Sequence, residues 1–176
     1  MFTEEQLEQA VIEYFQELGY PYMPAKELKR DKKDVLLLDR LEEALVKLNP
    51  EVPVEIIREV MRKIHYFETN DVLTNNKMFH KYLTEAVVVP ELVNGETVYH
   101  HVRLIDWETP ENNDFLVVNQ LEVIEKGQEK IPDIVLYVKG LPLVIAELKS
   151  TSREEVDIER VNFYGKHHYK RKRAAI

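Results

Sequence analysis

Residues 132–150 read Pro-Asp-Ile-Val-Leu-Tyr-Val-Lys-Gly-Leu-Pro-Leu-Val-Ile-Ala-Glu-Leu-Lys-Ser. Two apolar runs flank a Gly-containing turn in this stretch, which predicts a β-hairpin over 134–148. Polar side chains stand at its open end: Asp133 precedes the first run, and Glu147 and Lys149 end the second. Because alternate residues of a strand point to one face, Glu147 and Lys149 should leave the same face of the hairpin.

This grouping of charged residues has a chemical use. Two carboxylates at one place can hold a hard divalent cation through their oxygen atoms. A lysine beside them can orient or deprotonate a water molecule, or neutralise charge on an attacked phosphate. An acid followed by Glu-x-Lys one hairpin later therefore indicates phosphodiester hydrolysis. The alternative that these residues leave open is a buried hairpin with ordinary charged ends.

The register of the hairpin decides whether the three side chains can meet. An even-numbered loop centred on Gly140 and Leu141 would pair Asp133 with Leu148 and would send the acid to the opposite face. We therefore expect an odd-length loop or a β-bulge. Gly140 can supply the positive φ that such a turn needs.

The rest of the chain predicts helices first and strands later. Thr3 can cap a helix over 4–18, with Gln6 completing a capping box and Phe2 packing on Leu7. Glu8 lies at the edge of the apolar stripe of this helix, which consists of Leu7, Ala10, Val11, Tyr14, Phe15 and Leu18. Further helices are expected over 34–48, from Pro53 onward and over 75–84, and strands over 86–89, 98–105 and 115–124. This order predicts an α+β (mixed α/β) fold with a helical insertion at about 34–84.

Three segments carry a resemblance to a known family. Asn-Asn-Asp-Phe-Leu-Val-Val-Asn-Gln at 112–120, Pro-Asp at 132–133 and Gly-Leu-Pro-Leu at 140–143 resemble the N-terminal endonuclease domain of HsdR, the R subunit of type I restriction enzymes. The hairpin itself resembles the core of the PD-(D/E)xK nuclease superfamily. The similarity runs from about residue 2 to 160. It implies a restriction-endonuclease-like mixed β-sheet flanked by helices, with the 134–148 hairpin at the centre of the sheet. It also implies that the domain is a DNA endonuclease.

The resemblance also implies roles for individual residues. Asp133 and Glu147 would hold Mg²⁺, with the Leu148 carbonyl as a third oxygen, while Lys149 would position the water or the scissile phosphate. An acid on the first helix often lies near the metal in this superfamily, which makes Glu8 a candidate; the alternative is a solvated Glu on a helix flank. Double-stranded DNA is the implied substrate. The methyltransferase and specificity subunits of a type I complex are the implied partners.

Composition limits how such a domain would work. The 176-residue chain has no cysteine, no basic start followed by an apolar run and no membrane-length apolar run, so we expect a cytoplasmic protein without a membrane partner. The resemblance implies a bacterium or archaeon as the source. The net charge is −8, and residues 1–165 carry −13 once the five basic side chains of 166–176 are left out. Such a charge argues against binding DNA without metal ions and partner proteins.

Residues after the hairpin depart from the family. A helix is expected after Ser152, on which the family usually places a Gln and a Tyr four residues apart, but here Gly165 precedes Tyr169 at that spacing. We interpret 1–160 as the nuclease domain and 161–176 as an atypical basic tail, either disordered or a truncation scar. No glycine pair forms a phosphate-binding loop, so ATP would belong only to a motor region that is missing from this sequence. We therefore expect weak or no cleavage by the chain alone; the alternative function is an inactive docking or DNA-binding module of the same fold.

Overall fold

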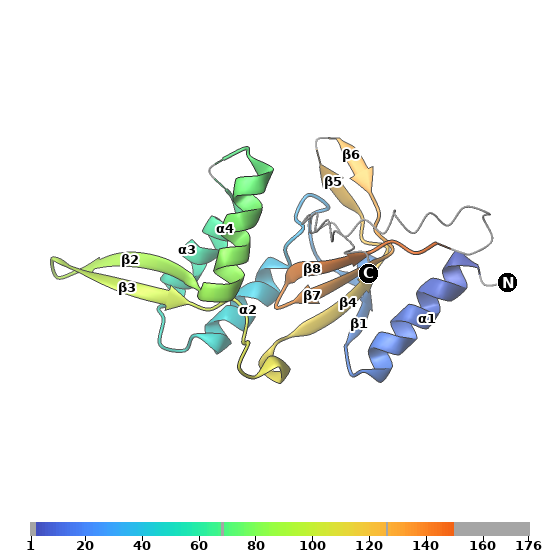
Figure 1. The fold of residues 1–176 in the computed structure, drawn as a ribbon, viewed down its shortest axis with the longest axis horizontal. Coiled ribbons are helices and arrows are strands. Elements are labelled where there is room, and N and C mark those ends of the chain that lie inside the picture. The colour runs from blue at the N-terminus through green and yellow to red at the C-terminus, as the bar shows by residue number, and fades with distance from the viewer. Residues whose placement is uncertain (1–2, 68, 126, 150–176) are drawn as a thin grey trace, which may run out of the picture.

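The computed structural model describes residues 3–67, 69–125 and 127–149. Its helices are α1 (Glu4–Glu17), α2 (Leu38–Leu48), α3 (Val54–His65) and α4 (Val72–Glu85), with 3₁₀ turns at Ala25–Glu27 and Pro110–Asn112 (Figure 1). The strands are β1 (Tyr22–Pro24), β2 (Val87–Val93), β3 (Glu96–Val102), β4 (Phe115–Asn119), β5 (Val123–Glu125), β6 (Gln128–Lys130), β7 (Ile134–Val138) and β8 (Leu141–Ala146). No helix in these ranges is long and apolar enough to cross a lipid bilayer. The expected helix after Ser152 and the tail 161–176 lie outside the described residues.

Four strands form the main sheet in the order β1–β4–β7–β8. β1 runs parallel to β4, and the other two pairs are antiparallel, which confirms the expected mixed sheet. The sequence predicted the 134–148 hairpin at the centre of the sheet, and that placement is wrong: β7 is an inner strand, but β8 is the last strand of the described sheet. β1 was not expected, because three residues between Pro21 and Ala25 carry no periodic signal.

Side chains on alternate positions of the sheet fill two separate cores. Val117 on β4 and Ile134 on β7 pack against Ile12 of α1 on one face. Val118 on β4 and Tyr137 on β7 belong to the cluster on the other face, with Leu116, Leu121, Val135 and Leu37. This alternation is the geometry of extended strands, in which successive side chains point to opposite faces. The sheet is therefore covered on both faces.

Helix α1 begins as its sequence predicts but packs only part of its predicted apolar stripe against the sheet. Thr3 and Gln6 form the expected capping box; Phe2, the other predicted contact, lies outside the described residues. Ile12 is the buried residue of this helix, whereas Tyr14 and Leu18 of the predicted apolar stripe are 60% and 55% exposed. Val11 and Phe15 of the stripe do pack against the cluster that contains Ile12. The prediction was wrong about Tyr14 and Leu18, because contact with the sheet, not the number of apolar residues, sets the rotation of the helix.

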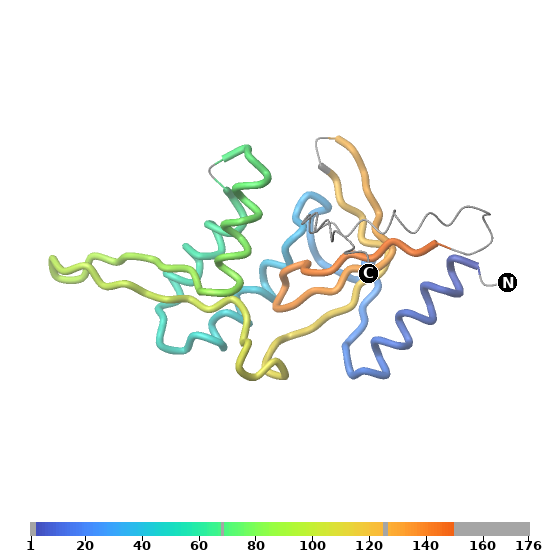
Figure 2. The backbone as a smooth tube through the Cα atoms, viewed as in Figure 1, coloured from blue at the N-terminus to red at the C-terminus, as the bar shows by residue number. Residues whose placement is uncertain are grey.

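Helices α2–α4 and the β2–β3 hairpin occupy the other half of the molecule, away from α1 (Figures 1 and 2). Residues of α2, α3, β2 and β3 share one apolar cluster, which also contains Val138 and Leu141 of the β7–β8 hairpin. Helix α2 starts at Leu38 rather than at the predicted residue 34, because the Leu37 N–H donates to the Gly140 carbonyl at 3.0 Å and is not available to a helix. The limits of the predicted insertion, about 34–84, stay a prediction.

The β7–β8 turn depends on Gly140. Lys139 and Gly140 both have positive φ, 51° and 79°, as a tight two-residue hairpin turn requires. A Cβ atom built on Gly140 would lie 2.6 Å from the Leu37 carbonyl oxygen, which is a backbone atom. The glycine is therefore needed both for its backbone conformation and for the close approach of residue 37.

We expect Gly140→Ala to lower the free energy of unfolding by about 2–4 kcal/mol, because the substitution adds a left-handed alanine and a clash with backbone. Gly95→Ala is the matched control: Gly95 also has a positive φ, 87°, but a Cβ there meets nothing within 4 Å. That control should lose only about 1 kcal/mol. Urea unfolding of both variants checks the prediction, and equal losses would contradict it.

Candidate active site

A β-bulge sets the register at the open end of the hairpin. Near the turn, Val138 pairs with Leu141 and Tyr137 with Pro142; beyond an irregularity between Leu136 and Tyr137, Leu136 pairs with Val144. The turn is centred on Lys139 and Gly140, one residue earlier than the sequence suggested. Without the bulge, this turn would set residue 133 opposite residue 146 and would separate the two acids.

The shifted register brings the predicted acids to the same face. Ile134 pairs with Ala146, so one further step sets Asp133 opposite Glu147. The Leu148 N–H donates to the Asp133 carboxylate Oδ2 at 2.6 Å, which joins the two strands beyond their last ladder pair. The Leu148 side chain packs in the cluster under α1. The hairpin thus holds its two carboxylates together through main-chain geometry.

Charges at the hairpin end act on one another. Glu147 is exposed, but partial burial of its carboxylate raises its pKa, the nearby Asp133 carboxylate raises this pKa further, and the Lys149 ammonium partly offsets both. Negative charge from two strands therefore converges at this point, and the positive charge of exposed Lys149 is close enough to be felt there. A cation would be attracted to such a place.

Glu8 reaches the same region from α1. Its Oε1 accepts a hydrogen bond from Asn119 Nδ2 at 2.7 Å, and its Oε2 accepts one from Gln120 Nε2. Gln120 Nε2 also lies 3.3 Å from Asp133 Oδ1. Glu8 is half-buried and hydrogen-bonded, so the structure does not show it as a freely solvated helix residue.

The prediction had not included Asn119 and Gln120 among the functional residues. They follow the apolar strand β4 directly and stand in the family-like segment, so the available signal was a polar pair at a strand end. Tyr22 extends the group, since its hydroxyl donates to Asn119 Oδ1 at 2.9 Å. Burial and the charge of Glu8 raise the pKa of Tyr22, which keeps its hydroxyl protonated as a donor.

Mg²⁺, which the sequence implies, needs several oxygen ligands close together. Among residues 3–67, 69–125 and 127–149, no three or more His, Asp or Glu side chains are close enough together to hold a metal ion. Asp133 and Glu147 form a pair, and Glu8 is joined to that pair through Gln120 rather than directly. A carboxylate pair beside a main-chain carbonyl is nevertheless an all-oxygen set, which suits a hard cation.

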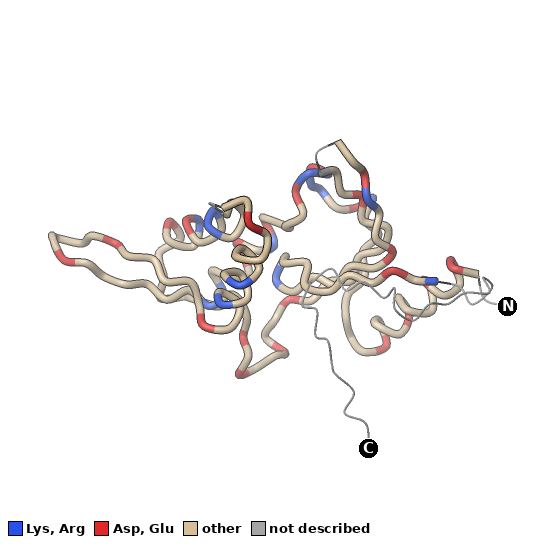
Figure 3. The backbone as a smooth tube through the Cα atoms, turned by 45° about the horizontal axis from the view of Figure 1, so that its top comes forward, with Lys and Arg blue, Asp and Glu red and all other residues tan. Residues whose placement is uncertain are grey.

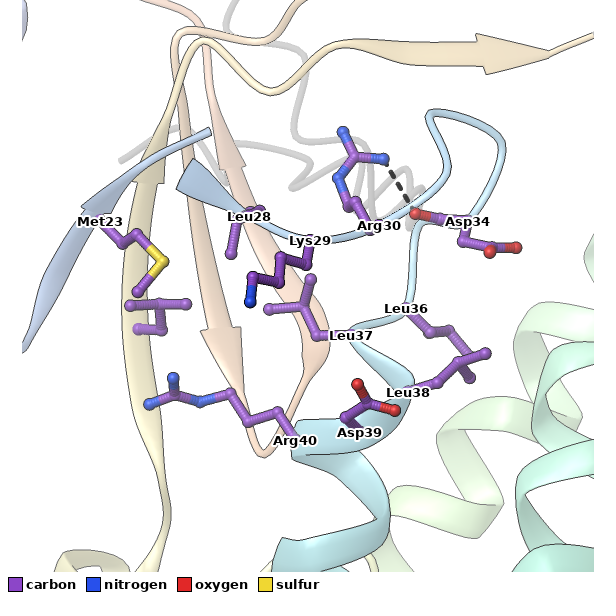
Figure 4. Close-up of a pocket in the computed structure, with 11 residues that line it drawn as sticks. Met23, Leu28, Lys29, Arg30, Asp34, Leu36, Leu37, Leu38, Asp39 and Arg40 are labelled. Atoms are coloured by element: carbon purple, nitrogen blue, oxygen red, sulfur yellow. Dashed lines mark hydrogen bonds between the residues drawn. The ribbon is translucent and has the colours of Figure 1, made fainter. Parts of the chain in front are cut away.

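Two cavities lie on the β1 side of the molecule. One, of about 330 Å³, is lined by Met23, Leu37 and Arg40 with their neighbours, and no predicted site residue borders it (Figure 4). A polar cleft of about 570 Å³ is lined by Tyr22, Asn119 and Gln120, together with Pro24, Ala25, Lys26, Leu28, Arg30, Lys32 and Glu122. The second cleft therefore adjoins the hydrogen bonds that connect Glu8 with Asp133.

We expect Glu147→Gln to stabilise the metal-free protein near neutral pH by less than about 1 kcal/mol, since the group is exposed and screened. The folded-state pKa of Glu147 is raised, so its ionised form is disfavoured by folding and stability is lost as pH rises through that pKa. The variant should gain nothing below about pH 3.5, where the acid is protonated in both states. Urea melts across this range check the sign; a variant less stable near neutrality would contradict it.

Comparisons with known proteins show which family the chain is similar to. The family model described as the type I restriction enzyme R protein N terminus matches residues 1–174. The HindI type I restriction enzyme endonuclease subunit of Haemophilus influenzae is 37% identical over 167 residues, which is 90% of this chain and 16% of the relative. A candidate type I restriction enzyme endonuclease subunit, MjaIXP of Methanocaldococcus jannaschii, is 30% identical over 165 residues, 89% of this chain and 16% of the relative.

These similarities define the class of the chain as a region of a restriction-enzyme subunit. The chain belongs to the family formed by the N-terminal region of type I restriction enzyme R proteins. It spans 16% of the length of the two relatives named above.

Proposed function

We propose that this chain is the metal-dependent DNA endonuclease domain of a type I restriction enzyme R subunit. The observation that carries the proposal is the bulge between Leu136 and Tyr137, which sets Asp133 opposite Glu147. A hairpin with a regular ladder would separate these acids, so the proposed function explains why the hairpin contains a bulge. Both relatives are named as endonuclease subunits of type I restriction enzymes, which supports the same function.

The carboxylates of Asp133 and Glu147 would hold Mg²⁺, with the Leu148 carbonyl as a further oxygen and Glu8 as a nearby acid. When bound, the cation would polarise a phosphoryl oxygen and lower the pKa of a water molecule. Asp133 keeps its orientation through the Leu148 N–H. Glu147 is prepared for a cation, because burial and the charge of Asp133 raise its pKa and make its ionised form costly without one.

Lys149 completes the set as the residue that positions the water or the scissile phosphate. It follows Glu147 by two positions, and its charge lowers the pKa of Glu147, which supports an ammonium near that carboxylate. An ammonium placed there stabilises negative charge that develops on the phosphate oxygens. The polar cleft beside Tyr22 and Gln120 leaves room for the adjoining part of a nucleic-acid strand.

Partner proteins should supply what the charge of this chain does not. Acidic and basic positions are interspersed along α2, α3 and α4 (Figure 3), and the net charge of the whole chain is −8. Few DNA phosphates can then be neutralised, and affinity for DNA should be low. In the proposed assembly, the methyltransferase and specificity subunits and an ATP-driven motor region bring double-stranded DNA to this domain in the cytoplasm of a bacterium or archaeon.

Metal-dependent stabilisation of the chain itself tests the proposal. Thermal melts with Mn²⁺ or Mg²⁺ should show stabilisation of the wild type, about 2.7 kcal/mol at a metal concentration 100 times Kd. Asp133→Asn should lose this gain. Glu43→Gln, which changes an exposed acid on α2 far from the hairpin end, is the matched control and should keep it. A wild type that gains nothing from either metal would contradict the proposal.

Plasmid nicking by a full-length R subunit that carries this domain separates the two functions of this fold. An endonuclease domain should give metal-dependent nicking in the assembled complex. An inactive docking module of the same fold would bind its partners and leave the plasmid intact.

A further inference from the structure

Gln120 has an unusual backbone conformation for its residue type. It follows the last residue of β4 with φ = 49°, in the left-handed region that side chains other than Gly, Asn and Asp rarely adopt. Its N–H donates to the Asp133 carbonyl at 3.0 Å, and the next N–H, of Leu121, donates to the Pro132 carbonyl at 3.3 Å. The backbone of Gln120 is thus anchored to Asp133, the residue that directly precedes β7. The strand predicted over 115–124 ends at this point.

The side chain of Gln120 stands between two carboxylates. Its Nε2 is 3.3 Å from Asp133 Oδ1 and donates to Glu8 Oε2 as well. An amide nitrogen carries two hydrogen atoms and can serve both acceptors at once. Without that bridge, two acids from different elements would face each other with only repulsion between them.

Neighbouring hydrogen bonds fix the direction of this bridge. The Tyr22 hydroxyl donates to Asn119 Oδ1 at 2.9 Å, which orients the Asn119 amide nitrogen toward Glu8 Oε1. At the other end, the Leu148 N–H holds Asp133 Oδ2. Both oxygens of the Glu8 carboxylate and both oxygens of the Asp133 carboxylate therefore have a hydrogen-bond donor. Gln120 is the donor that the two carboxylates share.

We infer that Gln120 is a positioning residue: its side-chain amide holds the carboxylates of Glu8 and Asp133 in place ahead of the cation and keeps Asp133 aligned with the opposing strand. The role of Gln120 toward a cation rests on the proposed function, but the alignment of Asp133 with the opposing strand is a property of the metal-free protein. Groups that orient metal ligands in this way typically change metal affinity by about 10- to 100-fold when they are removed.

Gln120→Gly removes the side-chain amide but keeps the backbone conformation, so it separates the role of the amide from effects on the fold. Glycine adopts positive φ without strain, so this variant should unfold no more easily than the wild type. Asn94→Gly is the matched control, since Asn94 has φ = 53° in the β2–β3 turn, far from the hairpin end. A purely structural role of Gln120 would show as a loss of stability in the metal-free protein.

Hydrogen exchange at the Leu148 amide is the first measurement. In metal-free protein, this N–H should exchange severalfold faster in Gln120→Gly, because its acceptor Asp133 is no longer held, and should be unchanged in Asn94→Gly. Unchanged protection in Gln120→Gly would overturn the inference whether or not metal binds.

Calorimetric Mn²⁺ titration is the second measurement. We expect affinity to fall at least about tenfold in Gln120→Gly and to stay at the wild-type value in Asn94→Gly. Equal affinity in Gln120→Gly and wild type would overturn the inference and leave the proposed function standing. A wild type that binds no Mn²⁺ would contradict the proposed function instead, and the exchange result alone would then decide the positioning role.

Discussion

Asp133→Ala, Glu147→Ala and Lys149→Ala are each expected to abolish plasmid nicking by a full-length R subunit assembled with its partner subunits. Removal of a single group that stabilises the transition state costs about 10²- to 10³-fold. The loss should reach or exceed this range here, since metal, water and phosphate must be aligned together. Relaxation of supercoiled plasmid with time, at saturating Mg²⁺, measures the effect.

The three variants should differ in metal binding although they agree in activity. Asp133→Ala and Glu147→Ala remove oxygen ligands and should lose the Mn²⁺-dependent gain in melting temperature, whereas Lys149→Ala should keep much of it. Lys77→Ala on α4, which removes an exposed base elsewhere, is the matched control for both measurements. Wild-type nicking by Lys149→Ala, or an undiminished Mn²⁺ gain in Asp133→Ala, would show that these roles are wrongly assigned.

Tyr137→Ala is expected to lower the free energy of unfolding by about 3–5 kcal/mol, the range for removal of a large buried side chain. Tyr137 is fully buried beside the bulge, and its hydroxyl donates to the Val35 carbonyl at 3.0 Å. Tyr137→Phe keeps the ring and should lose about 1 kcal/mol for the missing hydrogen bond. Tyr99→Ala on β3, where the ring is 63% exposed, should change stability by less than about 0.5 kcal/mol.

Alkaline pH provides a second readout for Tyr137. Burial raises the pKa of its hydroxyl to about 12 in the folded protein, against about 10 in an unfolded chain. The unfolded state therefore ionises first, and the stability contributed by this group is complete below about pH 10 and lost as pH rises toward 12. The free energy of unfolding of the wild type, measured by urea melts, should fall over this range. Tyr137→Phe should lack this part of the fall with pH. Parallel curves for the two proteins would contradict the assignment.

The sequence by itself determined the local elements and which charged residues stand at the hairpin end. The capping box of Thr3 and Gln6, the turn at Asn94 and Gly95 and the β7–β8 hairpin depend on residues close together in the chain, and all are present. The need for a bulge followed from the two-residue period of a strand. The family was recognised from the order of short motifs, which the comparisons confirm.

Only the tertiary structure decided which groups meet around that hairpin end. Glu8 and Asn119 are 111 residues apart in the chain, and their hydrogen bond requires α1 to present the side that carries Glu8 and Ile12 to the sheet. The apolar stripe of α1 predicted that Tyr14 and Leu18 face inward, but both are exposed, because a helix on a sheet follows the shape of its partner rather than its own composition. Likewise, the sequence gives no signal for the positive φ of Gln120, because glutamine rarely adopts it. Pairing with β7 imposes this conformation and directs the amide between two acids.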